Sequence, residues 1–181
     1  MRHRRISFAF MLLVLVVSQL CDAQESLGPR PKKARTVADY LPRTLKEISA
    51  RELGAEGPLE SPRDGDENII VNGDLRPSRV RATYAGRSRS LPQNKKAVLH
   101  RWAQLYAGAP THYTVPYQSE LLFEAEGMKY WLGFKKDSIA QFKKEIKRGK
   151  PVDLFLIRLG GAIDGDNWGP LLLVESFQKP K

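Results

Sequence analysis

A stretch without acidic residues is the most distinctive electrostatic feature of the sequence. No Asp or Glu occurs between Asp74 and Glu120, whereas eight Arg and Lys residues fall in that interval. Two of the arginines, Arg79 and Arg81, lie about 7 Å apart if they share one face of a strand. Such a face attracts anions. The candidate anion-binding residues are Arg79, Arg81, Arg87, Arg89 and Lys95.

The same basic residues have a plainer interpretation, which the sequence leaves open. On a solvated strand face, the arginines would pair with acids of a neighbouring strand, and Glu120, Glu124 and Glu126 are available. If the face instead binds a ligand, nearby aromatic rings would add stacking surface. The aromatic candidates are Tyr84, Trp102 and Tyr113.

A second candidate for contact with a partner is Trp131. The alternation over residues 128–135 places Tyr130 on the core face, so Trp131 points outward. An outward tryptophan marks a contact surface. Packing beneath the helix that follows would explain it equally well.

No residue pattern predicts a catalytic, metal or cofactor site. The run Asp164–Gly169 resembles a calcium loop, but Trp168 occupies the fifth position, where an oxygen ligand belongs, so we interpret the run as a turn. His100 and His112 have no second ligand at a metal-like spacing, and no nucleophile elbow occurs. A carboxylate pair for sugar cleavage among the three glutamates is not expected, since strand carboxylates of this kind are usually solvated.

The elements that must position these residues follow from hydrophobic periodicity. Alternating or continuous apolar runs predict strands, and apolar stripes at helical spacing predict two helices. The expected strands are 69–71, 78–84, 117–125, 128–135, 152–159 and 171–177, and the expected helices are 90–106 and 137–148. A loop is expected over 86–92, and a turn at Glu126-Gly127.

This order predicts an α+β fold. The expected architecture is a small five-stranded OB-like barrel, or a strongly curved antiparallel sheet, with two helices. A helix between the third and fourth of five strands is the order found in OB-type barrels, and closing the sheet removes exposed edges.

The N-terminus has the three-part pattern of a secretory signal over residues 1–23. Arg2, Arg4 and Arg5 precede an apolar run over 6–20, and Cys21-Asp22-Ala23 offers a cleavage site. The run is shorter than the ~20 residues that span a bilayer, so no transmembrane segment is expected after cleavage. We therefore expect an exported protein, periplasmic or extracellular, with the general secretory route favoured over the twin-arginine route.

Residues 24–66 are rich in proline and glycine and predict a largely disordered linker with one short amphipathic helix near 41–53. A single α+β domain is expected over 67–178. Cys21 is the only cysteine, so a chain that loses its leader has neither disulfides nor thiol chemistry. The net charge of +10 is carried largely by residues beyond the leader.

Four short blocks carry a resemblance to a group of uncharacterised exported bacterial proteins with no assigned activity. It covers about residues 78–177. The blocks are Arg79-Val80-Arg81-Ala82-Thr83-Tyr84, Glu120-Leu121-Leu122-Phe123, Tyr130-Trp131-Leu132 and Leu172-Leu173-Val174-Glu175-Ser176-Phe177. The group tends to carry Pro-Val-Gln where this chain has Gly133-Phe134-Lys135. The resemblance implies a bacterial envelope protein and assigns no site residues.

These observations favour a non-enzymatic, exported binding domain without a cofactor. Its expected ligand is an anionic envelope glycan or lipid, because the protein is basic. Nucleic acid is not the expected partner of an exported protein. The first alternative is a structural or scaffold protein of the envelope that acts through protein contacts at Trp131, and the second is an enzyme of unrecognised type.

Overall fold

The computed structural model describes residues 35–50, 69–72, 75–107, 114–164 and 167–180. Thr36–Lys181 forms one compact unit. The predicted signal and most of the predicted linker lie outside the described residues, as do Tyr113 and His112. None of the helices in the described ranges is both long and apolar enough to cross a membrane.

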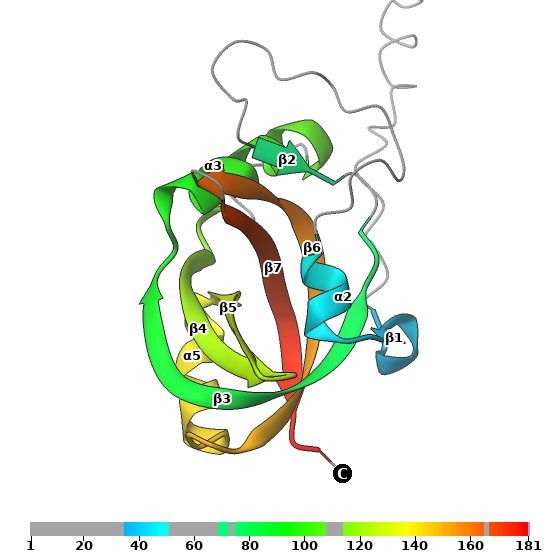
Figure 1. The fold of residues 1–181 in the computed structure, drawn as a ribbon, viewed down its shortest axis with the longest axis vertical. Helices are drawn as coiled ribbons and strands as arrows, with labels where there is room; N and C mark the ends of the chain where they lie inside the picture. The colour runs from blue at the N-terminus through cyan, green and yellow to red at the C-terminus, as the bar shows by residue number, and fades with distance from the viewer. Residues whose placement is uncertain (1–34, 51–68, 73–74, 108–113, 165–166, 181) are drawn as a thin grey trace, which may run out of the picture. The chain divides into compact units, whose positions relative to one another are not determined.

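The described residues form a mixed α+β fold, as predicted, with a seven-stranded sheet and three α-helices (Figure 1). The strands are β1 Leu41–Pro42, β2 Ile69–Val71, β3 Ser78–Ser90, β4 Tyr117–Ala125, β5 Met128–Lys135, β6 Pro151–Asp164 and β7 Asn167–Gln178. The helices are α2 Leu45–Ser49, α3 Gln93–Trp102 and α5 Lys136–Glu145, with short helical turns η1 Val37–Asp39 and η2 Ala103–Ala107.

Five of the strands pair in a ring. Their order is β3-β4-β5-β7-β6, and β6 pairs back onto β3. The long, curved β3 makes this possible, because residues 78–83 pair with β6 and residues 83–90 pair with β4 (Figure 1). The alternative of a strongly curved antiparallel sheet, and the expected number of two helices, are wrong in detail. β5 pairs in parallel with β7, β1 pairs in parallel with β3, and α2 is a third helix.

An aromatic cluster fills the inside of the ring, and α5 packs against it and contributes Phe142. Phe142 of α5 is fully buried, and its ring lies 4.9–5.8 Å from those of Tyr84, Phe123, Phe134 and Phe177. The predicted inward face of this helix is therefore confirmed at Phe142 and also at the buried Ile146. The solvent side of α5 is consequently left with the polar residues.

A second apolar cluster lies where α3 packs on β2, β6 and β7. It contains Val98, Leu99 and Trp102 of α3. The Trp102 indole donates a hydrogen bond to the Asn72 carbonyl over 2.9 Å, and the side chain is only 3% exposed. Trp102 and the buried Tyr84 are therefore core residues, and the expectation that they offer stacking surface is wrong.

Part of the range predicted as linker belongs to the folded unit. Leu45 and Ile48 of α2 are buried in the aromatic cluster. Tyr40 donates a hydrogen bond to Glu175 of β7 over 2.7 Å. The predicted domain start at residue 67 leaves out this packed segment, in which Thr44 caps α2 by accepting a hydrogen bond from Glu47.

An irregularity in β3 decides where its basic residues lie. The register with β4 shifts between Tyr84 and Ser88, and Gly86 has φ +80, a conformation that glycine adopts at little cost. Beyond it the strand continues to Ser90, where a loop was predicted. As a result, Arg89 stands directly opposite Glu120 of β4.

Candidate anion-binding site

A wholly buried carboxylate lies at the centre of the best-defined charged cluster. Glu120 is 0% exposed and sits in mid-sheet, opposite Arg89 on β3 and Gly133 on β5. A buried carboxylate is costly unless it is paired and hydrogen-bonded. The expectation that Glu120 is merely solvated is therefore wrong, and its partners define the site.

Two cations satisfy Glu120, one on each carboxylate oxygen. Lys95, from the first turn of α3, places Nζ 2.7 Å from Oε1. Arg89 donates from Nε to Oε2 over 2.7 Å, with Nη2 also 2.7 Å from Oε2. With Lys95 protonated, the trio carries one net positive charge. Glu120 therefore holds Arg89 in place without cancelling the charge of the site.

The buried position of Lys95 sets its electrostatics. Its side chain is 8% exposed. Burial lowers the pKa of the Lys95 ammonium, while the neighbouring Glu120 carboxylate acts in the opposite direction. Lys95 therefore stabilises the charged cluster from its buried side and does not reach a ligand in solvent.

Arg89 lies over the ring of Trp131. Its guanidinium carbon is 4.2 Å from the ring centroid, within the range of a cation–π contact. The Arg89 side chain remains 41% exposed, and Trp131 is half-buried on the outer face of β5. The contacts with Glu120 use Nε and Nη2, and Nη1 has no hydrogen-bond partner in the part of the chain that the structure describes. Arg89 thus presents a fixed cation at the surface.

The remaining predicted anion-binding residues do not join this cluster. Arg81 pairs with Asp153 of β6 through Nε and Nη2, at 2.7 and 3.0 Å. The Arg81 guanidinium holds the pKa of Asp153 below its ordinary value. Arg79 is half-buried and Arg87 is exposed, and neither forms an ion pair with a carboxylate of the described residues. Of the five candidates, only Arg89 and Lys95 come together.

The alternative that the arginines pair with acids of the neighbouring strand is therefore correct for one of the predicted arginines. Arg89 does pair with Glu120 of the neighbouring strand. The partner of Arg81 is Asp153, which sequence analysis did not single out, because the pairing of β3 with β6 was not predicted. The only signal for Asp153 is one acidic residue in the otherwise apolar run 152–157.

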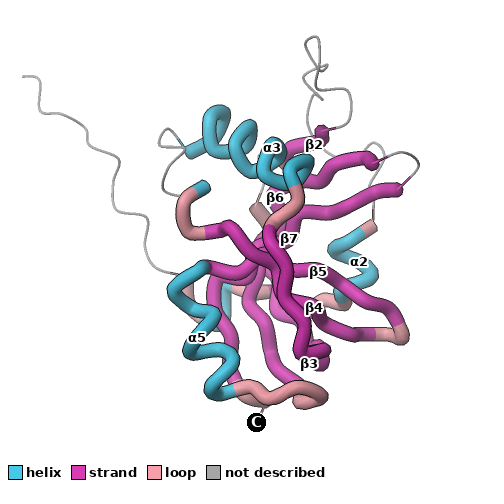
Figure 2. The backbone as a smooth tube through the Cα atoms, turned by 90° about the vertical axis from the view of Figure 1, so that its left-hand side faces the viewer, coloured by secondary structure: helices cyan, strands magenta, loops and turns pink. Residues whose placement is uncertain are grey.

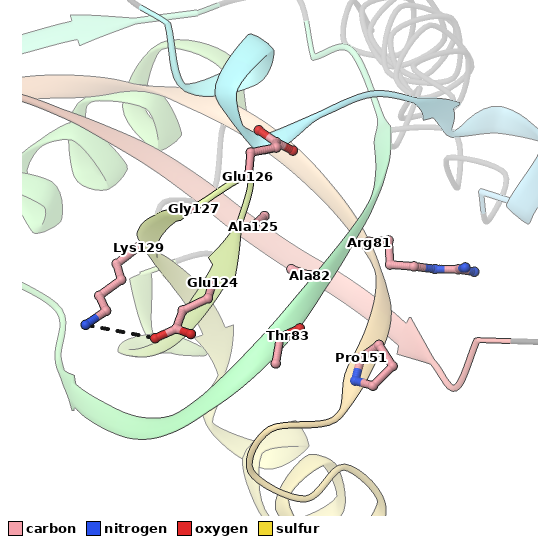
Figure 3. A pocket seen from close by; sticks show the side chains of 9 residues that line it. All are labelled: Arg81, Ala82, Thr83, Glu124, Ala125, Glu126, Gly127, Lys129 and Pro151. Carbon is pink, nitrogen blue, oxygen red and sulfur yellow. Dashed lines mark ion pairs between the residues drawn. The ribbon is translucent and has the colours of Figure 1, made fainter.

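An open pocket of about 650 Å³ lies at another place on the ring (Figure 3). It is lined by Arg81, Ala82, Thr83, Glu124, Ala125, Glu126, Gly127, Lys129 and Pro151. Its charged groups have partners: Lys129 lies 3.9 Å from Glu124, and Glu126 accepts a hydrogen bond from the Lys46 amide. In Figure 3 the Arg81 side chain points away from the other lining residues. The pocket is therefore separate from the Glu120 cluster, and its charged groups pair either with each other or with residues outside the lining.

The predicted turn over Asp164–Gly169 is described only in part, because residues 165–166 lie outside the described residues. Asn167–Gly169 belong to β7 and pair with the end of β6 as far as Asp164, so the predicted turn extends too far toward its C-terminal end. His100 is exposed on α3. Among the described residues, no three His, Cys, Asp or Glu side chains gather as a metal site would require.

Comparisons with known proteins add no family. No protein-family model matches the chain, and no curated protein matches it.

Proposed function

We propose that the protein is an exported domain that binds an anionic ligand, a carboxylate-bearing glycan of the bacterial envelope, at Arg89 and Trp131. The observation that carries this proposal is the Arg89 guanidinium, held by a buried Glu120 and stacked on an outward tryptophan. The signal-like N-terminus and the resemblance to exported bacterial proteins support a periplasmic or extracellular location.

The electrostatics favour an anion as the ligand. An arginine whose geometry is already fixed loses little conformational freedom when it binds, so more of the interaction energy appears as affinity. Arginine also presents a planar fork that matches carboxylate geometry. Because Lys95 compensates Glu120 from the buried side, the exposed side of the cluster stays positive.

The strand order supports the same face. We interpret the ring as an OB-type barrel, in which a helix joins the third and fourth strands and the third strand pairs with the fifth. The face of the second and third strands of such barrels is a common binding surface for oligosaccharides and oligonucleotides. In this chain those strands are β4 and β5, which carry Glu120 and Trp131.

Titration of the processed chain with polygalacturonate, and with a neutral glucan as comparison, tests the proposal. Binding to polygalacturonate should weaken as salt rises from about 50 to 200 mM. Arg89→Gln removes a charge-assisted contact worth about 1.5–3 kcal/mol, so affinity should fall roughly 10- to 100-fold. Trp131→Leu should also weaken binding. Lys46→Gln on α2 removes one exposed charge elsewhere and should have little effect.

Two results would overturn the proposal. One is equal binding of the neutral glucan, and the other is an unchanged affinity in Arg89→Gln. If Trp131→Leu instead abolishes the capture of a protein partner while Arg89→Gln leaves it intact, the scaffold alternative replaces the glycan-binding one.

A further inference from the structure

A second basic surface lies on and beside α5, and the proposed glycan site does not use it. Its members come from the end of α5, the segment after it and the irregularity in β3, and all of them are exposed. We name it the basic face; it consists of Arg87, Lys143, Lys144, Lys147, Arg148 and Lys150.

The fold brings the irregularity of β3, which carries Arg87, against the segment that carries the other five cations, although the two are far apart in sequence. The Gly149 amide donates to the Tyr84 carbonyl over 2.8 Å, and the Tyr84 amide donates to the Lys150 carbonyl over 3.1 Å. The Arg148 side chain packs so closely on Gly86 that an added Cβ there would lie 2.7 Å from its Cδ. Lys143 reaches the irregularity directly, with Nζ 3.5 Å from the Ser88 hydroxyl.

The basic face stays strongly positive, because residues 143–150 hold five cations and one acid, Glu145. None of its six cations forms an ion pair with a carboxylate there. The neighbouring Glu145 carboxylate accepts a hydrogen bond from Gln141 over 2.8 Å. Cations near the end of a helix also interact with its dipole, which explains a basic last turn. Arg87 and Lys150 are not on the helix, so the dipole does not account for the whole face.

The position of the face makes it available to a large partner. Figure 2 shows α5 on the outside of the strands at one end of the fold, and its apolar side is occupied by the core through Phe142 and the partly buried Ile139. The large exposed apolar side chains of the described residues lie elsewhere: Val37, Leu41, Leu105, Tyr106, Val115 and Met128. The face therefore has charge but nothing to insert into a hydrocarbon layer.

We propose that the basic face docks the protein on an anionic lipid bilayer. Four of its six cations are lysines, which act as hydrated point charges and suit a diffuse layer of headgroups better than a single oriented ligand. Clusters of four to eight basic residues bind anionic bilayers in this way, each adding about 1 kcal/mol, or about fivefold in affinity. This docking site is distinct from Arg89 and Trp131 and concerns another class of partner.

Co-sedimentation with vesicles tests the proposal on the processed chain, Gln24–Lys181, which contains the whole compact unit. The vesicles hold about 30% phosphatidylglycerol in phosphatidylcholine, and pure phosphatidylcholine is the comparison. The double variant Lys143→Gln/Lys147→Gln should bind the anionic vesicles roughly 20-fold more weakly, and the charge reversal Lys143→Glu/Lys147→Glu more weakly still. Lys46→Gln/Lys96→Gln removes two exposed charges outside the face and should bind nearly as the parent does.

Several outcomes would overturn the docking proposal. These are equal binding to neutral vesicles, an equal loss in the control double variant, and full binding by both variants of the basic face. If the variants of the basic face lose polygalacturonate binding and keep vesicle binding, the face is a glycan-binding surface instead. Arg89→Gln should lose polygalacturonate and keep the vesicles, so failure of the glycan site and failure of the docking surface are distinguishable.

Discussion

The guanidinium of Arg89 stacks on the indole of Trp131, with 4.2 Å between the guanidinium carbon and the ring centroid. From the sequence, the first residue is a candidate for anions and the second a candidate for protein contacts. The structure places them in one site on neighbouring parts of the sheet. The two hypotheses therefore concern the same surface. Substitutions at Arg89 and Trp131 separate the contribution of charge to binding from the contribution of shape.

Arg89→Lys keeps the positive charge but removes the planar fork and the stacked plane. We expect the affinity for polygalacturonate to fall about tenfold, while the free energy of unfolding changes by about 1 kcal/mol or less. Titration and urea unfolding measure the two quantities. Arg87→Lys is the matched control and should bind as the parent does, because Arg87 has no such contacts in the described residues. Undiminished binding by Arg89→Lys would mean that charge alone matters at the site.

The Lys95–Glu120 pair should be strongly coupled in stability. Glu120→Gln leaves a buried ammonium with no anion beside it and should cost about 3–5 kcal/mol in the free energy of unfolding. Lys95→Met should cost less, because Glu120 keeps Arg89 as a partner. The double variant should lose less than the sum of the two single losses, as measured by a double-mutant cycle in urea. Additive losses would show that the pair does not interact.

The same variant should have a characteristic pH dependence. Burial lowers the pKa of Lys95, and Glu120→Gln removes the carboxylate that opposes this shift. Between the lowered pKa and the ordinary lysine pKa, the unfolded variant binds more protons than the folded one, so its stability rises with pH across that interval. We expect the deficit of Glu120→Gln relative to the parent to be smaller at about pH 9 than at about pH 6. A deficit that is constant across this range would contradict the assignment of Lys95 as the uncompensated charge.

The strand pattern is the part of the fold that the sequence predicts well. Alternation identifies β4 and β5, and the apolar run at 152–159 identifies β6, because each strand has one or two faces in the core. The Glu126-Gly127 turn is also correct, with φ values of 52 and 75 at the two residues. Local patterns of this kind report burial and turn geometry directly.

The charged site was not predictable in the same way. That Arg89 meets Glu120 depends on a register shift next to Gly86, and that Arg81 meets Asp153 depends on a pairing between distant strands. Neither register is encoded in periodicity, since a shift in register changes which residues stand opposite each other.

The starts of the two predicted helices were also missed. Pro92 and Lys135 occupy the N-cap positions without side-chain capping bonds, so the usual N-cap preference for Ser, Thr, Asn or Asp does not locate either start.

The Arg81–Asp153 pair should make the protein sensitive to acid. The pKa of Asp153 is lowered chiefly by its hydrogen bonds from Arg81, so the pair stabilises the fold above the ordinary carboxyl pKa. That contribution is lost as pH falls through the lowered pKa. Asp153→Asn should reduce stability by roughly 1 kcal/mol at neutral pH and by less at low pH, where the parent loses the interaction too. Urea unfolding at several pH values measures this, and an equal deficit at every pH would refute it.

Two glycines with positive φ should respond very differently to substitution. Gly160 has φ +141, and a Cβ there would collide with the backbone of β2 at Ile70 and Val71. Gly127 has φ +75, with no atom within 4 Å of the added carbon. Gly127→Ala should therefore cost about 1–2 kcal/mol from backbone strain alone. Gly160→Ala should cost clearly more and expose the α3 cluster, which hydrogen exchange at Trp102 would detect; equal costs would mean that β2 moves aside freely.

The segment before the predicted domain start packs into the core. Leu45 is fully buried in the aromatic cluster, so Leu45→Ala should leave a cavity and cost about 2–5 kcal/mol in the free energy of unfolding. Leu41→Ala is the control, because Leu41 is 55% exposed and its removal should cost about 0.5 kcal/mol or less. A linker would tolerate both changes equally. Similar unfolding midpoints for the two variants would therefore place this segment outside the cooperative unit, whereas a marked loss in Leu45→Ala alone makes α2 part of the core that holds the ring together.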